Sequence, residues 1–399
     1  AKGITRDGKN DDLHGGNNGW TGYSWNTDLF PDYRRFLQKL HERNLCITLN
    51  LHPAQGVRYF EDFYEEMARA MGVDPKTEVQ IPFDISSDRY INAYFEVLHR
   101  PYEKDGVDFW WIDWQQGSES SIEGLDPLWA LNHYHYLDNG LFHHPLILSR
   151  YCGIGSHRYP LGFSGDTLVT WKTLKYLPYF TATASNVGYT WWSHDIGGHM
   201  LGYKDDELYV RFLQFGVFSP INRMHSTSCL TFTKEPWAYM GGTGLIAEEF
   251  LRLRHRMIPF LYSASYENTD NGLALIEPMY YAYPEKSEAY ECPDQYLFGG
   301  QLLVAPATEK AKEEGMSRIP VWLPDGRWTD LFTGDEYQGG CHLTMVRWLD
   351  SIPVLLKEGG FFVLDNRETT NDWTNPEKLK VIVSRGTGSY TLHEDLDGE

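Results

Sequence analysis

The sequence has little cysteine, little positive charge and no long apolar run. Its five cysteines are widely separated and form no Cys-x-x-Cys pair, so neither a disulfide framework nor a zinc knuckle is predicted. Lys and Arg total 35 against 55 Asp and Glu, and the net charge of −20 argues against binding to nucleic acid or an anionic membrane. No apolar run approaches the roughly 20 residues of a membrane span, and the first residues contain no hydrophobic signal-peptide core. We therefore expect a soluble enzyme or binding protein with neutral partners, whose compartment and oligomeric state the sequence does not identify.

Motifs for nucleotide and metal binding are also missing. The Gly-Gly pairs lack the surrounding pattern of a phosphate-binding loop, and His133, His135, His143 and His144 have no acidic or cysteine partner at a zinc-like spacing. We therefore predict no cofactor and no metal. Aromatic residues, by contrast, make up 15% of the chain. Such rings suit a surface that stacks on sugars, although an aromatic core would use the same residues.

Helical and apolar segments alternate along the first 280 residues. Tyr33, Phe36, Leu37 and Leu40 lie on one face of a helix over residues 31–43, and an apolar strand at 45–52 follows. The pattern recurs, with helices near 59–71, 88–102, 127–137, 171–184, 205–214 and 245–266, and strands near 107–114, 145–150, 189–195, 217–222 and 273–279. This alternation predicts a parallel sheet with helices outside it.

Polar residues stand at the end of nearly every predicted strand: His52, Asp113, Arg150, Asp195, then Arg223 with His225. A β/α barrel builds its active site at these strand ends, whereas a doubly wound sheet gathers ligands at one switch point. We therefore predict an α/β chain with a (β/α)8 TIM-type barrel. Only six strands are predicted, and the Gly- and Asn-rich first residues resemble the middle of a loop. We expect the first two strands to be missing rather than hidden.

The pattern of apolar segments and turn residues changes from about residue 285. Short apolar segments at 296–298, 302–305, 321–323 and 360–364 are separated by turns such as Pro-Asp-Gly at 324–326. This predicts a C-terminal antiparallel β-sandwich. Another β-like stretch at 380–392 follows a polar break. We expect a barrel over 1–284, a β-sandwich over 285–365, and the start of a further β-domain over 366–399.

Three aspartates stand out in this arrangement. Asp113 follows the very apolar run of residues 109–112, Asp166 lies on a Ser-Gly-Asp loop, and Asp195 ends an aromatic strand. Each could simply shape a turn or cap a loop. A buried carboxylate is costly without partners, however, and several carboxylates around an aromatic-lined barrel mouth suit glycoside hydrolysis. That reaction needs one carboxyl group as nucleophile or base and another as acid.

An ordered set of motifs resembles glycoside hydrolase family 31, the α-glucosidase and α-xylosidase family. The motifs are WWIDWQQG (110–117), SRYCGIGSHRYPLGFSGD (149–166), SHDIGG (193–198) and NRMHS (222–226), followed by IEPMYYAYP, DQYLFGGQLLVAP, LPDGRWTDLFTG and IPVLLKEGG. The resemblance covers nearly the whole chain. It implies a retaining α-glycosidase with a double-displacement mechanism, in which Asp113 is the nucleophile and Asp166 the general acid/base.

The resemblance also implies residues that bind the sugar. Arg150 and His225 match groups that bind sugar hydroxyls, Asp195 matches an aspartate lining the glycone subsite, and Trp111 and Phe163 match its aromatic wall. His199, just after the Gly pair of SHDIGG, is predicted at the rim of the site, or else is an ordinary loop residue. The expected partner is a neutral carbohydrate.

Departures from the family pattern leave the sugar open. Trp114, Gln115 and Gln116 stand where the family often has Met-Asn-Glu, and Phe163 where it often has Trp. The substrate class could be an α-glucoside, which we favour, an α-xyloside or an α-galactoside, and the activity could include transglycosylation. A non-catalytic carbohydrate-binding protein on a degenerate hydrolase scaffold is the alternative from another class. Because the family's N-terminal β-sandwich and two earlier barrel strands are not seen, we expect the chain to be part of a longer protein.

Overall fold

The structure is a computed structural model that describes residues 23–113, 117, 119–142, 144–312, 315–368 and 372–395. Trp114, Gln115, Gln116 and His143 lie outside the described residues. The chain divides into two compact units, Ala1–Phe163 and Ser164–Glu399, which we take in turn. In the described ranges, no helix combines the length and apolarity that crossing a membrane requires.

The first unit contains four neighbouring parallel strands, β1 (Thr48–Leu51), β2 (Phe109–Ile112), β3 (Leu148–Arg150) and β4 (Gly162–Phe163). In the register, Trp111 of β2 lies between Asn50 and Leu148. The first three strands confirm the prediction, while the two-residue β4 was not predicted. Because parallel strands run the same way, the residues that follow them gather at one edge of the sheet.

Helices connect these strands, as the apolar periodicity predicted. They are α1 (Tyr33–His41), α2 (Tyr64–Met71), α3 (Asp88–Ala93), α4 (Arg100–Lys104) and α5 (Pro127–Asn139), with the π-helical turn η4 (Tyr94–His99) between α3 and α4 and the 3-10 turns η2 (Pro53–Gln55), η3 (Pro75–Thr77) and η5 (Ser156–Arg158). The side chain of Asp126 accepts hydrogen bonds from two backbone N–H groups at the start of α5, where Pro127 stands. Aromatic side chains such as Tyr90, Tyr94 and Trp110 pack with aliphatic side chains in the core.

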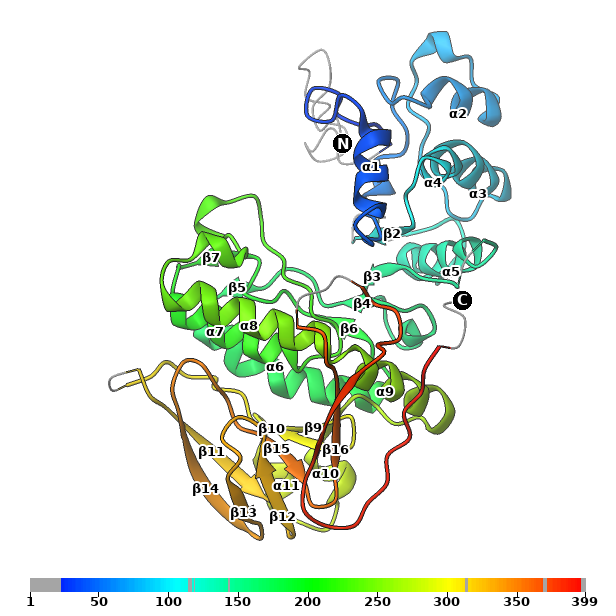
Figure 1. Cartoon of the computed structure of the whole chain (residues 1–399). Coiled ribbons are helices and arrows are strands. Elements are labelled where there is room, and N and C mark those ends of the chain that lie inside the picture. The colour runs from blue at the N-terminus through cyan, green and yellow to red at the C-terminus, as the bar shows by residue number, and fades with distance from the viewer. Residues whose placement is uncertain are drawn as a thin grey trace. The chain divides into compact units, whose positions relative to one another are not determined.

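The second unit begins with helices and very short strands. The helices are α6 (Trp171–Ala184), α7 (Asp206–Val217), α8 (Gly242–Arg256) and α9 (Ile258–Asn271), with the 3-10 turns η6 (Ser185–Val187), η7 (Leu230–Phe232) and η8 (Pro236–Ala238). Strands β5 (Leu168–Val169) and β7 (Met200–Gly202) pair in parallel, and β6 is Trp192–Ser193. Figure 1 shows α7 and α8 side by side.

Two predicted elements of this unit are wrong. The strand near 217–222 is absent, because α7 continues to Val217 and its residues from Leu208 onward are all buried, so an apolar run there does not distinguish helix from strand. Met224 instead forms an isolated parallel bridge with Ile196. The single helix over 245–266 is two helices, because Pro259 cannot donate a helical hydrogen bond and stands in the first turn of α9.

The C-terminal part is antiparallel, as predicted. Its largest sheet has the order β13-β12-β15-β10-β9-β8, built from Glu336–Gln338, Arg327–Asp330, Val354–Lys357, Leu302–Val304, Tyr296–Phe298 and Ile276–Pro278. The run at 273–279 was predicted as a parallel strand; it forms β8, which pairs antiparallel with β9. Its hydrophobicity signalled a strand but not the partner. The short helices α10 (Met279–Ala282) and α11 (Glu288–Glu291) lie in the connection between them.

Two antiparallel strand pairs complete the second unit. Strand β11 (Ser317–Leu323) pairs with β14 (Cys341–Arg347), and β16 (Phe361–Asp365) pairs with β17 (Leu379–Val383). The predicted domain boundary at residue 365 therefore falls between two strands that are hydrogen-bonded to each other. The three-part division of the chain stays a prediction.

Candidate active site

In the first unit, Asp113 is placed by the end of β2. Its backbone N–H donates to the carbonyl of Leu51 at 3.3 Å, so the parallel ladder fixes the residue itself. Its side chain is 13% exposed, and one carboxylate oxygen accepts a hydrogen bond from Arg150 Nε at 3.1 Å. The other lies 3.4 Å from His52 Nε2. Side chains at the ends of three neighbouring strands thus meet at Asp113.

Aromatic rings lie beside this carboxylate. The rings of Trp111 and Phe163 meet edge to face, with centroids 6.0 Å apart. The Arg150 guanidinium lies over the Phe163 ring, 5.4 Å from its centroid. The arrangement joins an anion, hydrogen-bond donors and flat apolar faces, which is the combination that sugar recognition requires.

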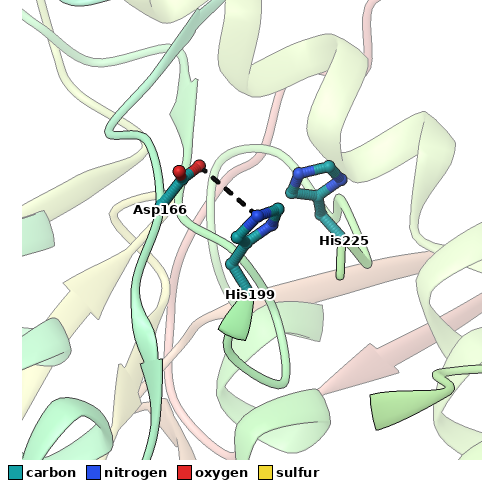
Figure 2. A group of neighbouring side chains, drawn as sticks. All are labelled: Asp166, His199 and His225. Carbon is teal, nitrogen blue, oxygen red and sulfur yellow. Dashed lines mark ion pairs between the residues drawn. The ribbon is translucent and has the colours of Figure 1, made fainter. Parts of the chain in front are cut away.

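In the second unit, Asp166 lies near two histidines that come from other loops (Figure 2). His199 Nε2 is 3.8 Å from the Asp166 carboxylate, and the imidazoles of His199 and His225 stack with centroids 4.6 Å apart. The Asp166 side chain is 39% exposed. The structure therefore brings together three of the predicted site residues that are far apart in sequence.

This trio also has a spacing that a metal ion could use. The ligand atoms of Asp166, His199 and His225 lie within 4.8 Å of one another. Two imidazoles and a carboxylate can equally bind sugar hydroxyls and hold a proton. The expectation that no metal takes part stays a prediction.

Asp195 occupies the interior behind the Asp166 loop. It is 1% exposed, and its Oδ1 accepts a hydrogen bond from Arg223 Nη1 at 2.8 Å. Its Oδ2 accepts the backbone N–H of Thr167 at 3.0 Å, next to Asp166. Burial raises the pKa of Asp195, while Arg223 acts in the opposite direction. The carboxylate thus supports the loop that presents Asp166.

Backbone hydrogen bonds tie these loops together. The N–H of His199 donates to Thr167 O at 2.8 Å, and the N–H of Thr227 donates to His199 O at 2.9 Å. The segments that carry Asp166, His199 and His225 are therefore linked through their main chains. Among the described residues, the buried Nδ1 of His199 has no hydrogen-bond partner.

Two contributors were not among the predicted site residues. His52 and Arg223 were recognised as polar residues at strand ends, but the chemistry of the motifs did not single them out. Each instead contacts one of the predicted aspartates. Their position after a predicted strand was the signal that could have found them.

Comparisons with known proteins decide the family. Residues 11–264 match the family model of the glycosyl hydrolases family 31 TIM-barrel domain, and residues 272–361 match the glycosyl hydrolase family 31 C-terminal domain. The chain belongs to glycosyl hydrolase family 31. The family and the predicted fold class are thereby confirmed.

Two relatives with named activities match the chain at low sequence identity. An α-xylosidase of Saccharolobus solfataricus is 24% identical over 96% of this chain and 54% of its own length. Mouse neutral α-glucosidase C is 31% identical over 63% of this chain and 28% of its own length. This family 31 chain thus spans about half or less of the length of these relatives.

Solved structures share the fold. The cycloalternan-forming enzyme of Listeria monocytogenes, in complex with a pentasaccharide substrate, has a TM-score of 0.79 at 20% identity and covers 92% of this chain and 39% of its own. A family 31 α-xylosidase from a soil metagenome, complexed with xylose, has a TM-score of 0.71 at 24% identity, with coverage of 86% and 57%.

Proposed function

We propose that this protein is a retaining α-glycoside hydrolase that acts on neutral α-linked carbohydrates. The observation that carries the proposal is the placement of Asp113 in a family 31 chain. Its carboxylate lies where three parallel strands end, between Arg150 and His52 and beside the aromatic pair Trp111 and Phe163. Relatives named α-xylosidase and α-glucosidase support the same reaction class.

In the proposed first step, a carboxylate oxygen of Asp113 attacks the anomeric carbon. The bond from that carbon to the glycosidic oxygen breaks, and Asp166 gives its proton to the departing oxygen. Arg150 and His52 can hold the Asp113 carboxylate in its ionised, nucleophilic form because each can donate a hydrogen bond to it.

In the second step, Asp166 removes a proton from water, which attacks the anomeric carbon and releases Asp113. The 39% exposure of the Asp166 side chain is compatible with proton exchange with water and substrate. Two inversions at one carbon give net retention.

The remaining predicted residues are assigned to sugar binding. Arg150 and His225 would bind hydroxyl groups, His199 would lie at the rim beside Asp166, and Trp111 and Phe163 would line the glycone. Asp195 would shape the site from behind, since both of its oxygens are engaged by Arg223 and Thr167. We favour an α-glucoside as substrate, with transfer to a second sugar as an additional outcome.

A panel of aryl α-glucosides, α-xylosides and α-galactosides tests the function. We expect hydrolysis of at least one member, and proton NMR of the early product should show the α-anomer first. Asp113→Ala is the matched negative control. Absence of turnover on the entire panel, or a β-anomer formed first, would contradict the proposal.

A further inference from the structure

Lys234 is a buried lysine that the proposed mechanism does not use. It lies between η7 and η8 and is 7% exposed, although lysine is rarely buried to this degree. Its side chain crosses Gly197 so closely that a Cβ on Gly197 would lie 2.4 Å from Lys234 Cε. The lysine chain and the Asp195–Gly198 turn are therefore packed directly against each other.

The lysine is fixed at several atoms. Its Nζ donates to the carbonyl of Phe232 at 2.9 Å, its backbone N–H donates to a carboxylate oxygen of Glu235 at 3.1 Å, and its carbonyl accepts the Tyr209 hydroxyl at 2.8 Å. Burial lowers the pKa of the Lys234 ammonium to about 8, while the negative charges of Asp195 and Glu235 oppose this shift. The ammonium thus lies in the field of the buried Asp195.

The turn that Lys234 packs against is hydrogen-bonded to Thr167, the residue after Asp166. Within it, the N–H of Gly198 donates to Asp195 O at 2.9 Å. From it, the Asp195 carboxylate holds the N–H of Thr167, and the N–H of His199 holds the Thr167 carbonyl. The N–H of Thr167, the residue after Asp166, is thereby anchored to this turn, and its carbonyl is anchored to His199, the residue that follows the turn.

We propose that Lys234 is a positioning residue for proton transfer by Asp166. Its chain packs on Gly197 and its ammonium attracts Asp195, so that the turn holds Thr167, and with it the Asp166 carboxyl, in place. The catalytic part of this inference rests on the role proposed above for Asp166. The mechanical part, from Lys234 to Thr167, does not.

A leaving-group comparison tests the catalytic part. Lys234→Met keeps most of the chain and removes the charge, and Lys172→Met removes an exposed lysine of α6 as the matched control. With a substrate whose leaving group needs a proton, we expect Lys234→Met to lower kcat/KM about 10- to 100-fold, because misplacement by about 1 Å has effects of this size. With a dinitrophenyl glycoside, the loss should be less than about threefold. Equal losses on both substrates, or no loss on either, would overturn the catalytic part.

Hydrogen exchange tests the mechanical part without any activity. In Lys234→Met, peptides covering residues 164–170 should exchange at least about tenfold faster at neutral pH, because the Thr167 N–H loses protection. The 317–323 strand and the Lys172→Met control should be unchanged. Unchanged exchange at 164–170 would refute the positioning role even if the enzyme proved inactive on every glycoside. If Lys234→Met does not fold, Lys234→Gln, which can still donate to the Phe232 carbonyl, replaces it in both measurements.

Discussion

The two proposed catalytic carboxylates have different surroundings. Asp113 ends a strand, is 13% exposed and is approached by Arg150 and His52. Asp166 lies on a loop, is 39% exposed, approaches His199 at 3.8 Å and is supported from behind through Thr167. The first carboxylate is thus enclosed and approached by two donors, whereas the second is open to solvent. In the proposed mechanism, the environment rather than the residue type would divide the labour between these two aspartates.

Removal of Asp113 should have the largest effect. Without the nucleophile no glycosyl-enzyme forms, so Asp113→Ala should lower kcat/KM by more than about 10⁴-fold on every substrate, whatever its leaving group. The measurement is initial rates on aryl glycosides with good and poor leaving groups. Glu66→Ala, at an exposed position of α2, is the control and should retain activity. Substantial turnover by Asp113→Ala would remove its assignment.

Asp166→Ala should distinguish the role of general acid from that of nucleophile, because its effect should depend on the leaving group. In initial-rate measurements, loss of general acid catalysis should lower kcat/KM about 10²- to 10⁴-fold on substrates with poor leaving groups. On a dinitrophenyl glycoside the first step should be almost unaffected, because that leaving group needs no proton. Asp270→Ala, at an exposed position of α9, serves as the control. The assignment fails if both substrate types lose activity to the same extent.

The position of Asp113 could be predicted from the sequence, because polar residues at the ends of parallel strands gather at one edge of the sheet. The apolar run of residues 109–112 followed by Asp113 placed this residue at the edge of a parallel sheet, and Arg150 was found in the same way. The surroundings of Asp195 could not be predicted in this way. They depend on Arg223 and Thr167, which lie 28 residues after and 28 residues before Asp195. The periodicity of apolar residues does not predict the orientation of a single carboxylate side chain.

The same limit applies to the fold. The family motifs and the helix–strand alternation predicted the architecture, because burial imposes those patterns directly. Val217, at the start of the run at 217–222, belongs to the buried part of α7, and the run at 273–279 pairs with an antiparallel partner. In both cases a short apolar segment shows that it is buried but not against what.

Arg150 links the Asp113 carboxylate to the aromatic wall. Arg150→Ala removes a charged hydrogen bond, typically worth about 1.5–3 kcal/mol, so kcat/KM should fall roughly 10- to 100-fold, mainly through kcat. Thermal melting should change little, since the side chain is 21% exposed and stands at a strand end. His52→Gln, whose contact with Asp113 is longer, should lose less. A large drop in melting temperature with normal kcat in the folded fraction would make Arg150 a structural residue instead.

The smallest expected effect concerns two buried histidines, one packed on the strand that leads to Asp113 and one next to Asp195. His99 packs on Trp110 of β2, which leads to Asp113, and His194 directly precedes Asp195. Burial lowers the pKa of His99 to about 4 and that of His194 to about 3. Because the unfolded chain binds these protons near the ordinary value of 6.5, acid favours unfolding, and stability is lost as pH falls from about 6.5 toward the folded pKa values.

Each of these histidines should therefore contribute about 2 kcal/mol to the loss of unfolding free energy between pH 7 and pH 5. Urea unfolding at the two pH values measures this contribution. His99→Gln should reduce the acid sensitivity by about that amount, whatever its effect on stability at pH 7, whereas His157→Gln at an exposed position should not. Because β2 leads to Asp113, acid inactivation that is relieved by His99→Gln would trace to the fold behind this carboxylate rather than to its protonation. If the pH dependence of His99→Gln matches that of the original protein, His99 is not neutral in the folded state as its burial requires.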